Sequence, residues 1–283
     1  QIFKQLLMIS GFDKYFQIAR CFRDEDLRAD RQPEFTQIDV EVSFPETETL
    51  FSLVEGLMAA LFDAAGRKID LPFPRMAYRE AMDRFGSDKP DTRFGMELRD
   101  VSSTAARTPF RVFSETVASG GAVLGLVVKG AASWSRKPID DLVALARTLG
   151  SAGLVWIRLG TEALTSSSLK ALGEEGCRSL AAALEAQTGD LVLLAAGERD
   201  RTCQILGALR LHLGRTLSLV DTTRPRLLWV RDFPLFERNE EGGLGSGHHP
   251  FTSPHPEDLH RLETDPASIR ALAYDLVLNG EEI

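Results

Sequence analysis

The sequence lacks three features that would restrict its interpretation at once: long apolar runs, an excess of basic residues and paired cysteines. In 283 residues, no apolar run reaches the ~18 residues that a helix needs to cross a bilayer. Lys and Arg number 33 against 41 Asp and Glu, and this net charge of −8 excludes a uniformly basic nucleic-acid binder, although not a local basic groove. The 3 cysteines (Cys21, Cys177 and Cys203) do not make a disulfide framework. We expect buried, reduced thiols in a cytoplasmic protein without a membrane segment.

The composition is that of an ordinary globular protein, with 43% hydrophobic and 26% charged residues. The length indicates two domains or one large domain. The chain starts at Gln1 inside an apolar helical pattern over residues 1–10, and it stops at Ile283 directly after another apolar segment. We therefore expect a fragment of a longer protein, whose missing parts carry part of the function.

Near the start of the chain, two segments have strand patterns on either side of a charged loop. Residues 15–22 form the first, and residues 23–34 are too polar for a core and include the helix breaker Pro33. From 35 to 44 the residues alternate with a period of two, which predicts an antiparallel hairpin with one buried and one open face. The predicted buried face carries Thr36, Ile38, Val40, Val42 and Phe44. The predicted open face carries Phe35, Gln37, Asp39, Glu41 and Ser43.

The rest of the chain divides by pattern into three further parts. Apolar residues from Leu50 to Leu61 follow helical spacing, which predicts an amphipathic helix packed on the hairpin sheet and ending at Gly66. Residues 94–222 alternate short apolar strands with Ala- and Leu-rich helices, as in a separate α+β module. Beyond it we expect a strand at 227–230, a loop at 242–252 and a helix or buried strand at 269–278.

Arg23 and Phe35 are the first candidates for chemistry. A guanidinium matches phosphate oxygens with two parallel hydrogen bonds, but a charged turn with weak surface ion pairs explains Arg23 equally well. Phe35 is an aromatic residue on an otherwise polar face, where a flat ligand stacked on its ring would explain it. A neighbouring helix covering an edge residue would explain it too.

These residues lie in a longer motif. Phe22-Arg23-Asp24-Glu25, a loop, then Arg31 and Phe35 before an alternating strand resemble motif 2 of the class II aminoacyl-tRNA synthetases. The whole string from 17 to 39 is similar to that of the bacterial-type aspartyl-tRNA synthetases. Three other segments resemble the same family: residues 1–5 its substrate loop, residues 248–252 (His-His-Pro-Phe-Thr) a signature of its second half, and residues 273–282 the run into its motif 3.

The resemblance implies an α+β fold, in which the antiparallel sheet of a class II synthetase with flanking helices is interrupted by a smaller α+β insert. The catalytic core would comprise residues 1–93 and 223–283, and the insert residues 94–222. The reaction would be an aspartate–tRNA ligase reaction, in which ATP activates L-aspartate to aspartyl-adenylate and the 3′ end of tRNA(Asp) accepts the aspartyl group. The tRNA(Asn) stays open as a second acceptor. The full-length protein would be a homodimer, and this fragment alone would be inactive because it lacks motif 1 and nearly all of motif 3 of the family.

Site roles also follow from the resemblance. The aspartate-binding residues would be Gln1, Lys4, Arg23, Asp39 and His248, with Lys4 on the side-chain carboxylate and Gln1 and Asp39 on the α-ammonium group. The ATP-binding residues would be Arg23, Asp24, Glu25, Arg31, Gln32, Phe35 and Glu282, with Phe35 stacked on adenine. Arg23 would be catalytic, because it neutralises charge on the α-phosphate. Asp275 and Glu282 would hold Mg²⁺ against the phosphates.

Three alternatives stay open beside this interpretation. Lysyl or asparaginyl specificity is the nearest, although the insert and Lys4 argue against both. An amide-forming ligase on the same core would activate aspartate but transfer it to ammonia. A catalytically silent relative that binds only RNA or a partner would not need Arg23 and Asp39.

Overall fold

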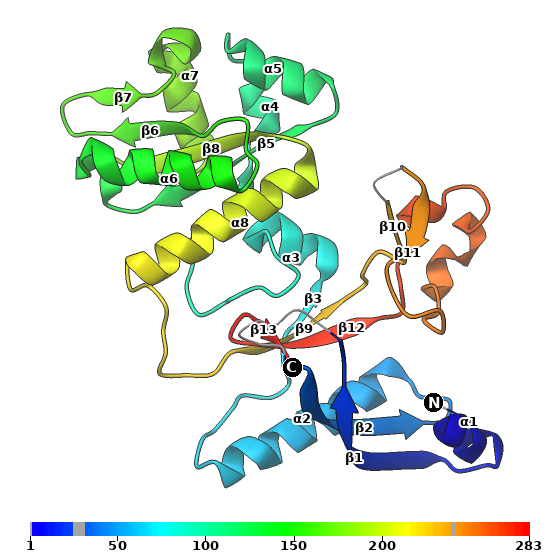
Figure 1. Cartoon of the computed structure of the whole chain (residues 1–283). Helices are drawn as coiled ribbons and strands as arrows, with labels where there is room; N and C mark the ends of the chain where they lie inside the picture. Colours follow the sequence, from blue (N-terminus) through cyan, green and yellow to red (C-terminus); the bar gives the residue numbers. More distant parts are fainter. Residues whose placement is uncertain (1, 25–31, 239–241) are drawn as a thin grey trace. The chain divides into compact units, whose positions relative to one another are not determined.

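The computed structural model describes residues 2–24, 32–238 and 242–283, and the chain forms two compact units (Figure 1). The first unit spans Gln1–Phe73 and the second Pro74–Ile283. Mixed helices and mainly antiparallel sheets confirm the predicted α+β class. In the described residues, no helix combines the length and apolar character that a bilayer crossing requires.

The first unit is built on the predicted hairpin. Strands β1 (Lys14–Phe22) and β2 (Glu34–Val42) pair in antiparallel register, so that Gln17 faces Asp39 and Cys21 faces Phe35. Helix α1 (Ile2–Ile9) precedes the hairpin, as the sequence predicts, and helix α2 (Thr47–Ala64) follows it. Partners in such a ladder point to the same face, which places the odd-numbered side chains of both strands together.

The alternation is confirmed, but the predicted burial of the two faces is wrong. On the apolar face, Phe16 and Ile18 are each 74% exposed, and Ile38 is 52% exposed. On the polar face, Phe35 and Asp39 are half-buried. The reason is that α1 lies over the polar face through Lys4, which pairs with Asp39, while the described residues of this unit leave the apolar face exposed.

Helix α2 confirms the predicted helix, and Gly66 with a φ of 70° follows its end. The prediction that its apolar stripe packs on the sheet is wrong. Within this helix only Phe51 and Glu55 are buried, whereas Leu53 and Leu61 are each 49% exposed. Helical spacing shows which residues share a face, but it does not show what covers that face.

In the second unit, one sheet has the strand order β13-β12-β9-β3. These strands are β3 (Arg75–Ala77), β9 (Leu227–Arg231), β12 (Tyr274–Leu278) and β13 (Glu281–Glu282). The strand predicted at 227–230 is confirmed, and the segment 269–278, left open as helix or strand, contains β12. Strand β3 runs parallel to β9, so the intervening 78–226 segment leaves the sheet at one end of this strand pair and re-enters it at the other. Helix α3 (Tyr78–Phe85) packs on this sheet through Ala81 and Phe85.

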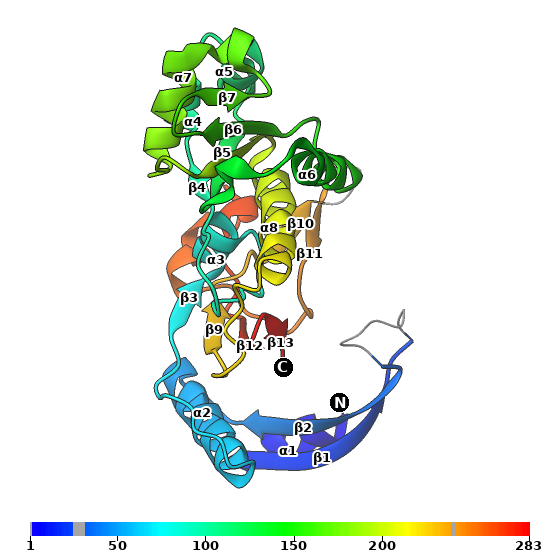
Figure 2. The ribbon, with the colours of Figure 1, turned by 90° about the vertical axis from the view of Figure 1, so that its left-hand side faces the viewer.

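The second sheet of this unit lies between two helical layers (Figures 1 and 2). Its order is β4-β5-β8-β6-β7, with all neighbours antiparallel. The strands are β4 (Arg99–Asp100), β5 (Ala122–Val128), β6 (Val155–Leu159), β7 (Leu164–Ser166) and β8 (Leu191–Gly197). One layer contains α6 (Arg136–Thr148) and α8 (Arg199–Thr216). The other contains α4 (Ser102–Ala105), α5 (Arg111–Ala118) and α7 (Leu169–Ala183).

Short elements complete the second unit. The prediction of a loop throughout 242–252 is wrong at Leu244–Ser246, which form β11 and pair with β10 (Phe236–Arg238). The 3₁₀ helices in the described part of the chain are η1 (Ala131–Ser133), η2 (Pro256–Arg261) and η3 (Pro266–Ser268). Helices α3 and α8 meet at two glycines, because a Cβ on Gly207 would lie 2.6 Å from the carbonyl oxygen of Gly86. This close approach anchors the segment after α3 to α8.

Candidate functional site

The polar face of the hairpin carries a compact group of charged residues. The Nζ of Lys4 lies 2.9 Å from Oδ1 of Asp39 and 2.9 Å from Oε1 of Glu41. Gln17 donates from Nε2 to the other carboxylate oxygen of Asp39 at 3.1 Å. Strand alternation places these acceptors on one face, and α1 brings the ammonium group to them.

These contacts shift the proton affinities in opposite directions. Hydrogen bonds to Asp39 and Glu41 raise the pKa of Lys4, and the hydrogen bond from Lys4 lowers the pKa of Asp39. Both groups are therefore charged near neutral pH. A fixed ammonium beside a fixed carboxylate complements a ligand that carries both charges, such as an amino acid with an acidic side chain.

Arg23 and Phe35 lie at the open end of the same hairpin. The backbone N–H of Arg23 donates to the carbonyl of Pro33 at 2.9 Å, which extends the ladder by one step. The Cζ of Arg23 lies 5.1 Å from the centroid of the Phe35 ring. The register places Phe35 and Asp39 on one face. The hairpin therefore presents the Phe35 ring beside the Arg23 guanidinium near its open end, and the Asp39 carboxylate farther along the same face.

The structure says less about the other predicted site residues of this unit. Asp24 and Gln32 are exposed at the two ends of the described hairpin. Gln1, Glu25 and Arg31 lie outside the described residues. Their roles stay predictions from the resemblance.

In the second unit, His248 is half-buried and has a defined position. Its Nε2 lies 3.1 Å from the carbonyl oxygen of Pro234, and its ring meets Phe233 edge-on with centroids 5.8 Å apart. Asp275 lies on β12 and Glu282 on β13, with Glu282 paired in register with Val277. Asp275 and Val277 point to the same face because they are two residues apart.

Asp275 and Glu282 form a pair of interacting carboxylates. Burial, with the negative charge of Glu282 as the next cause, raises the pKa of Asp275 to about 6. The Nζ of Lys89 lies 2.8 Å from Oε2 of Glu282. Among the described residues, no group of three or more His, Cys, Asp or Glu side chains could hold a metal ion. Two carboxylates do fit Mg²⁺, which commonly binds one or two carboxylates together with substrate phosphates.

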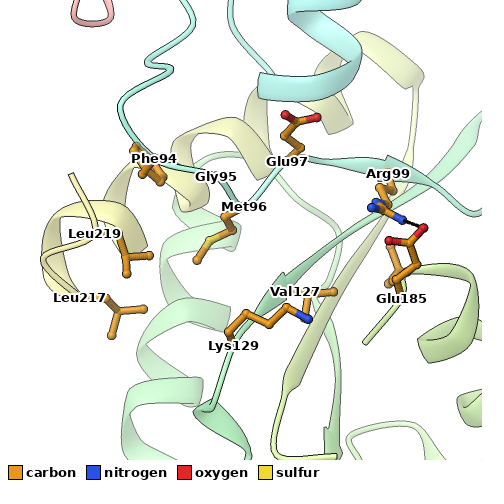
Figure 3. A pocket seen from close by; sticks show the side chains of 11 residues that line it. Phe94, Gly95, Met96, Glu97, Arg99, Val127, Lys129, Glu185, Leu217 and Leu219 are labelled. Carbon is orange, nitrogen blue, oxygen red and sulfur yellow. Dashed lines mark ion pairs between the residues drawn. The ribbon is translucent and has the colours of Figure 1, made fainter. Parts of the chain in front are cut away.

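A separate hollow of about 580 Å³ contains none of the predicted residues (Figure 3). One side is apolar, with Met96, Leu217 and Leu219, and another carries the ion pair between Arg99 and Glu185 at 2.6 Å. Its acidic and basic groups balance, so it shows no charge preference for a ligand.

Sequence reasoning missed two residues that contact the predicted site. Gln17 is visible as a polar residue in a strand, and pairing it with position 39 would have required the register. Lys89 lies far from Glu282 in the sequence, and no spacing rule connects them. Its position in the polar segment Gly86-Ser87-Asp88-Lys89-Pro90 is its one local signal.

Comparison with known proteins gives a consistent set of relatives. The family model described as tRNA synthetases class II (D, K and N) matches residues 1–283. An aspartate–tRNA(Asp/Asn) ligase of Thermoanaerobacter sp. is 50% identical, and one of Geobacillus sp. is 52% identical. An aspartate–tRNA ligase of Halalkalibacterium halodurans is also 52% identical. Each alignment covers 100% of this chain and 48% of the relative, so the chain spans about half the length of these relatives.

Proposed function

Because the chain belongs to the class II tRNA synthetases (D, K and N), we propose that it is the aspartate-activating part of an aspartate–tRNA ligase. The observation that carries this proposal is the contact between Lys4 and Asp39 on the hairpin face. Lysine offers an ammonium to an acidic side chain, and Asp39 offers a carboxylate to an α-ammonium group. The names of the relatives given above support the same substrate.

Aspartate would bind between Lys4 and Asp39 by replacing their ion pair with ion pairs to its own charged groups. Its side-chain carboxylate takes the place of Asp39 or Glu41 on the Lys4 ammonium, and its α-ammonium group binds Asp39 and Gln1. Arg23 binds the reacting carboxylate, and His248 covers the amino acid. Lysine as substrate would bring a second ammonium to Lys4, and that like-charge repulsion argues against lysyl specificity.

The first step joins aspartate to AMP. An oxygen of the α-carboxylate attacks the α-phosphorus of ATP, the bond to the β-phosphate breaks, and pyrophosphate leaves. Arg23 neutralises the growing charge on the α-phosphate, while Phe35 stacks on adenine and Asp24, Glu25, Arg31 and Gln32 line the nucleotide site. Asp275 and Glu282 would hold Mg²⁺, which supplies positive charge to the phosphates. No side chain acts as a nucleophile.

The second step transfers the aspartyl group to RNA. A hydroxyl at the 3′ end of tRNA(Asp) attacks the activated carbonyl, and AMP leaves. The relatives from Thermoanaerobacter and Geobacillus carry names that include both tRNA(Asp) and tRNA(Asn), so tRNA(Asn) is a second proposed acceptor. We propose that the full-length protein acts in the cytoplasm as a homodimer.

We also propose the division into a core of residues 1–93 and 223–283 and an insert of residues 94–222. The parallel pairing of β3 with β9 supports it, because the chain leaves the first sheet of the second unit after β3 and returns to that sheet as the neighbouring strand β9. The intervening sheet has apolar clusters on both faces.

Aspartate-dependent exchange between pyrophosphate and ATP tests the function in the full-length protein. We expect exchange with L-aspartate and none with lysine or asparagine. Lys4→Met should raise the KM for aspartate at least ~100-fold, because it leaves a substrate carboxylate without its charged partner. Lys14→Met on β1 is the matched control and should leave the KM unchanged.

Two results would overturn the proposal. One is the absence of aspartate-dependent exchange, and the other is exchange with lysine at comparable rates. The second step distinguishes the tRNA ligase from the amide-forming ligase, because transfer of the aspartyl group to ammonia would release asparagine without any tRNA.

A further inference from the structure

Arg210 on α8 is a fully buried cation held by backbone carbonyl groups. Its Nη2 donates to the carbonyl oxygens of Asp91 at 2.9 Å, Phe94 at 2.8 Å and Gly95 at 3.0 Å. Its Nε donates to the carbonyl of Met96 at 3.0 Å. These bonds fix the backbone of residues 91–96, which belong to the 86–98 segment between α3 and β4. We call this segment the connector.

The surroundings of Arg210 explain why this contact holds the connector rigidly. The Cζ lies 3.9 Å from the centroid of the Phe94 ring and 4.9 Å from that of Phe85. Removal from water lowers the pKa of Arg210 to about 10, so the side chain is still charged at neutral pH. A buried charge is tolerated only where hydrogen bonds replace water, and here the connector backbone supplies them. Displacing the connector would leave that charge without its acceptors.

The connector also touches the strands that carry the two carboxylates. Lys89 reaches Glu282 at 2.8 Å. At the turn between β12 and β13, a Cβ on Gly280 would lie 2.9 Å from the Cβ of Asp91. The connector therefore contacts this hairpin through an ion pair and through close packing. Figure 3 shows Phe94 and Met96 of the connector, which line the hollow described above.

We propose that Lys89 is a positioning residue for the Asp275–Glu282 pair, which it holds with its ammonium until a divalent cation and nucleotide take its place. Arg210 fixes the connector and so keeps Lys89 at Glu282. This inference rests on the proposed function, because it assumes that the two carboxylates receive a metal ion. It gives the 94–222 segment, which carries Arg210, a role in arranging the nucleotide site.

The physical basis is competition between the Lys89 ammonium and a divalent cation for the carboxylate oxygens of Asp275 and Glu282. An ammonium near Glu282 offsets the repulsion between the two carboxylates and keeps them close together without metal. The same ammonium must yield when a divalent cation binds, so it weakens metal binding by the free protein. Removing it should therefore tighten metal binding, whereas general damage to the fold would weaken it.

The first experiment measures Mn²⁺ binding by electron paramagnetic resonance in the full-length protein, without nucleotide. We expect Lys89→Met to bind Mn²⁺ about threefold to fivefold more tightly than the wild type, the range that a partly exposed ion pair gives. Lys89→Arg should restore the wild-type affinity to within about twofold. Lys129→Met is the matched control, because it removes another lysine paired at 2.9 Å, here with Asp190 away from the carboxylate pair.

The second experiment tests the link through Arg210. Arg210→Met should raise the hydrogen exchange of the connector amides and tighten Mn²⁺ binding in the same direction as Lys89→Met. In the double variant the Mn²⁺ affinity should equal that of Lys89→Met alone, since both changes act through one ammonium. If Arg210→Met fails to fold, Arg210→Lys, which keeps the charge but loses the forked donors, replaces it in the cycle.

Each outcome decides between the claims. Unchanged or weaker Mn²⁺ binding in Lys89→Met would overturn the role of Lys89, and fully additive effects would overturn the link to Arg210. Asp275→Asn is the reference for the metal site itself. If it leaves Mn²⁺ binding intact, the proposed metal ligands are wrong and the inference falls with them. Aspartate-dependent exchange by the wild type decides the proposed function separately.

Discussion

The two units of the chain bury their apolar residues very differently. In the first unit, the apolar face of the hairpin is open, with Phe16 and Ile18 each 74% exposed. In the second unit, the sheet β4-β5-β8-β6-β7 has helices on both faces, and Leu193 and Ile157 are fully buried. Apolar strand patterns in the sequence thus lead to exposed strands in the first unit and to core strands in the second.

The difference teaches that a strand pattern determines which residues share a face and that other segments determine which face is buried. On the hairpin, the charged contacts of Lys4 draw α1 onto the polar face. In the second unit, α6 and α8 cover one side of the sheet and α7 helps to cover the other. Stability should accordingly depend on core residues of the second unit far more than on apolar residues of the hairpin.

The largest expected change in the free energy of unfolding comes from truncating a buried aliphatic residue, and an exposed aliphatic residue serves as the comparison. Leu193→Ala should lower the free energy of unfolding of the second unit by about 2–5 kcal/mol, because it leaves a cavity in the core. Ile18→Ala should change that of the first unit by less than about 0.5 kcal/mol. Urea unfolding followed by circular dichroism measures both. Similar losses for the two variants would contradict the comparison.

A pair of glycine substitutions should act in opposite directions. Gly207→Ala should destabilise the second unit by roughly 1–3 kcal/mol, because its Cβ would meet the backbone of Phe85 at 2.7 Å and of Gly86 at 2.6 Å. Gly56→Ala, in exposed α2 with nothing within 4 Å, should stabilise the first unit by about 0.5–1 kcal/mol. Thermal unfolding of both variants provides the test, and a gain from Gly207→Ala would refute the close contact.

The charged contact on the hairpin should be weaker and should depend on pH. Lys4→Met should lower the stability of the first unit by about 1 kcal/mol near neutral pH. Asp39 has a pKa below the ordinary 3.8, so its contribution is present above pH 3.8 and is lost as the pH falls through its lower folded value. Lys4 has a pKa above 10.5, so its contribution is complete below 10.5 and is lost as the pH rises through its higher folded value.

Hydrogen exchange of the β1 and β2 amides against pH measures this effect. The difference between wild type and Lys4→Met should be constant between these limits and should vanish beyond them. A difference that persists after Asp39 is protonated would show that Lys4 stabilises the hairpin by packing alone.

The smallest expected effect on folding concerns the open face itself. Ile18→Gln should change the free energy of unfolding by less than about 0.5 kcal/mol, yet it should reduce the binding of a fluorescent apolar dye to the chain. Ser52→Gln on exposed α2 is the control. Equal dye binding by wild type and Ile18→Gln would show that this face is covered in solution.

Much of the local structure could be predicted from the sequence, because short-range patterns decide it. The hairpin, α2 and the strand at 227–230 follow directly from hydrophobic spacing. Helix α8 was not predicted, although it is the longest described helix of the second unit. The contacts of Gly207 and Arg210, which lie on it, were not predicted either. From the sequence alone, Arg210 would be predicted on the surface. Its hydrogen-bond acceptors lie 114 to 119 positions away in the chain, so no local pattern reveals them.

The candidate site shows the same limit. Phe35 and Asp39 could be placed on one face because they alternate in one strand, and Arg23 could be placed at the end of the strand before it. The contact of Lys89 with Glu282 could not, since it depends on how the connector is anchored to α8. Predicted roles for Gln1, Glu25 and Arg31 rest on the family resemblance alone.

The way Arg210 is held has a consequence for how the protein tolerates change. Its acceptors are main-chain oxygens, which every amino acid supplies, so the side chains at positions 95 and 96 can be exchanged without removing a hydrogen bond. The donor has no such freedom, because no other side chain offers a planar fork of several N–H groups. A saturation scan should therefore find position 210 intolerant and position 95, where a Cβ meets nothing within 4 Å, permissive.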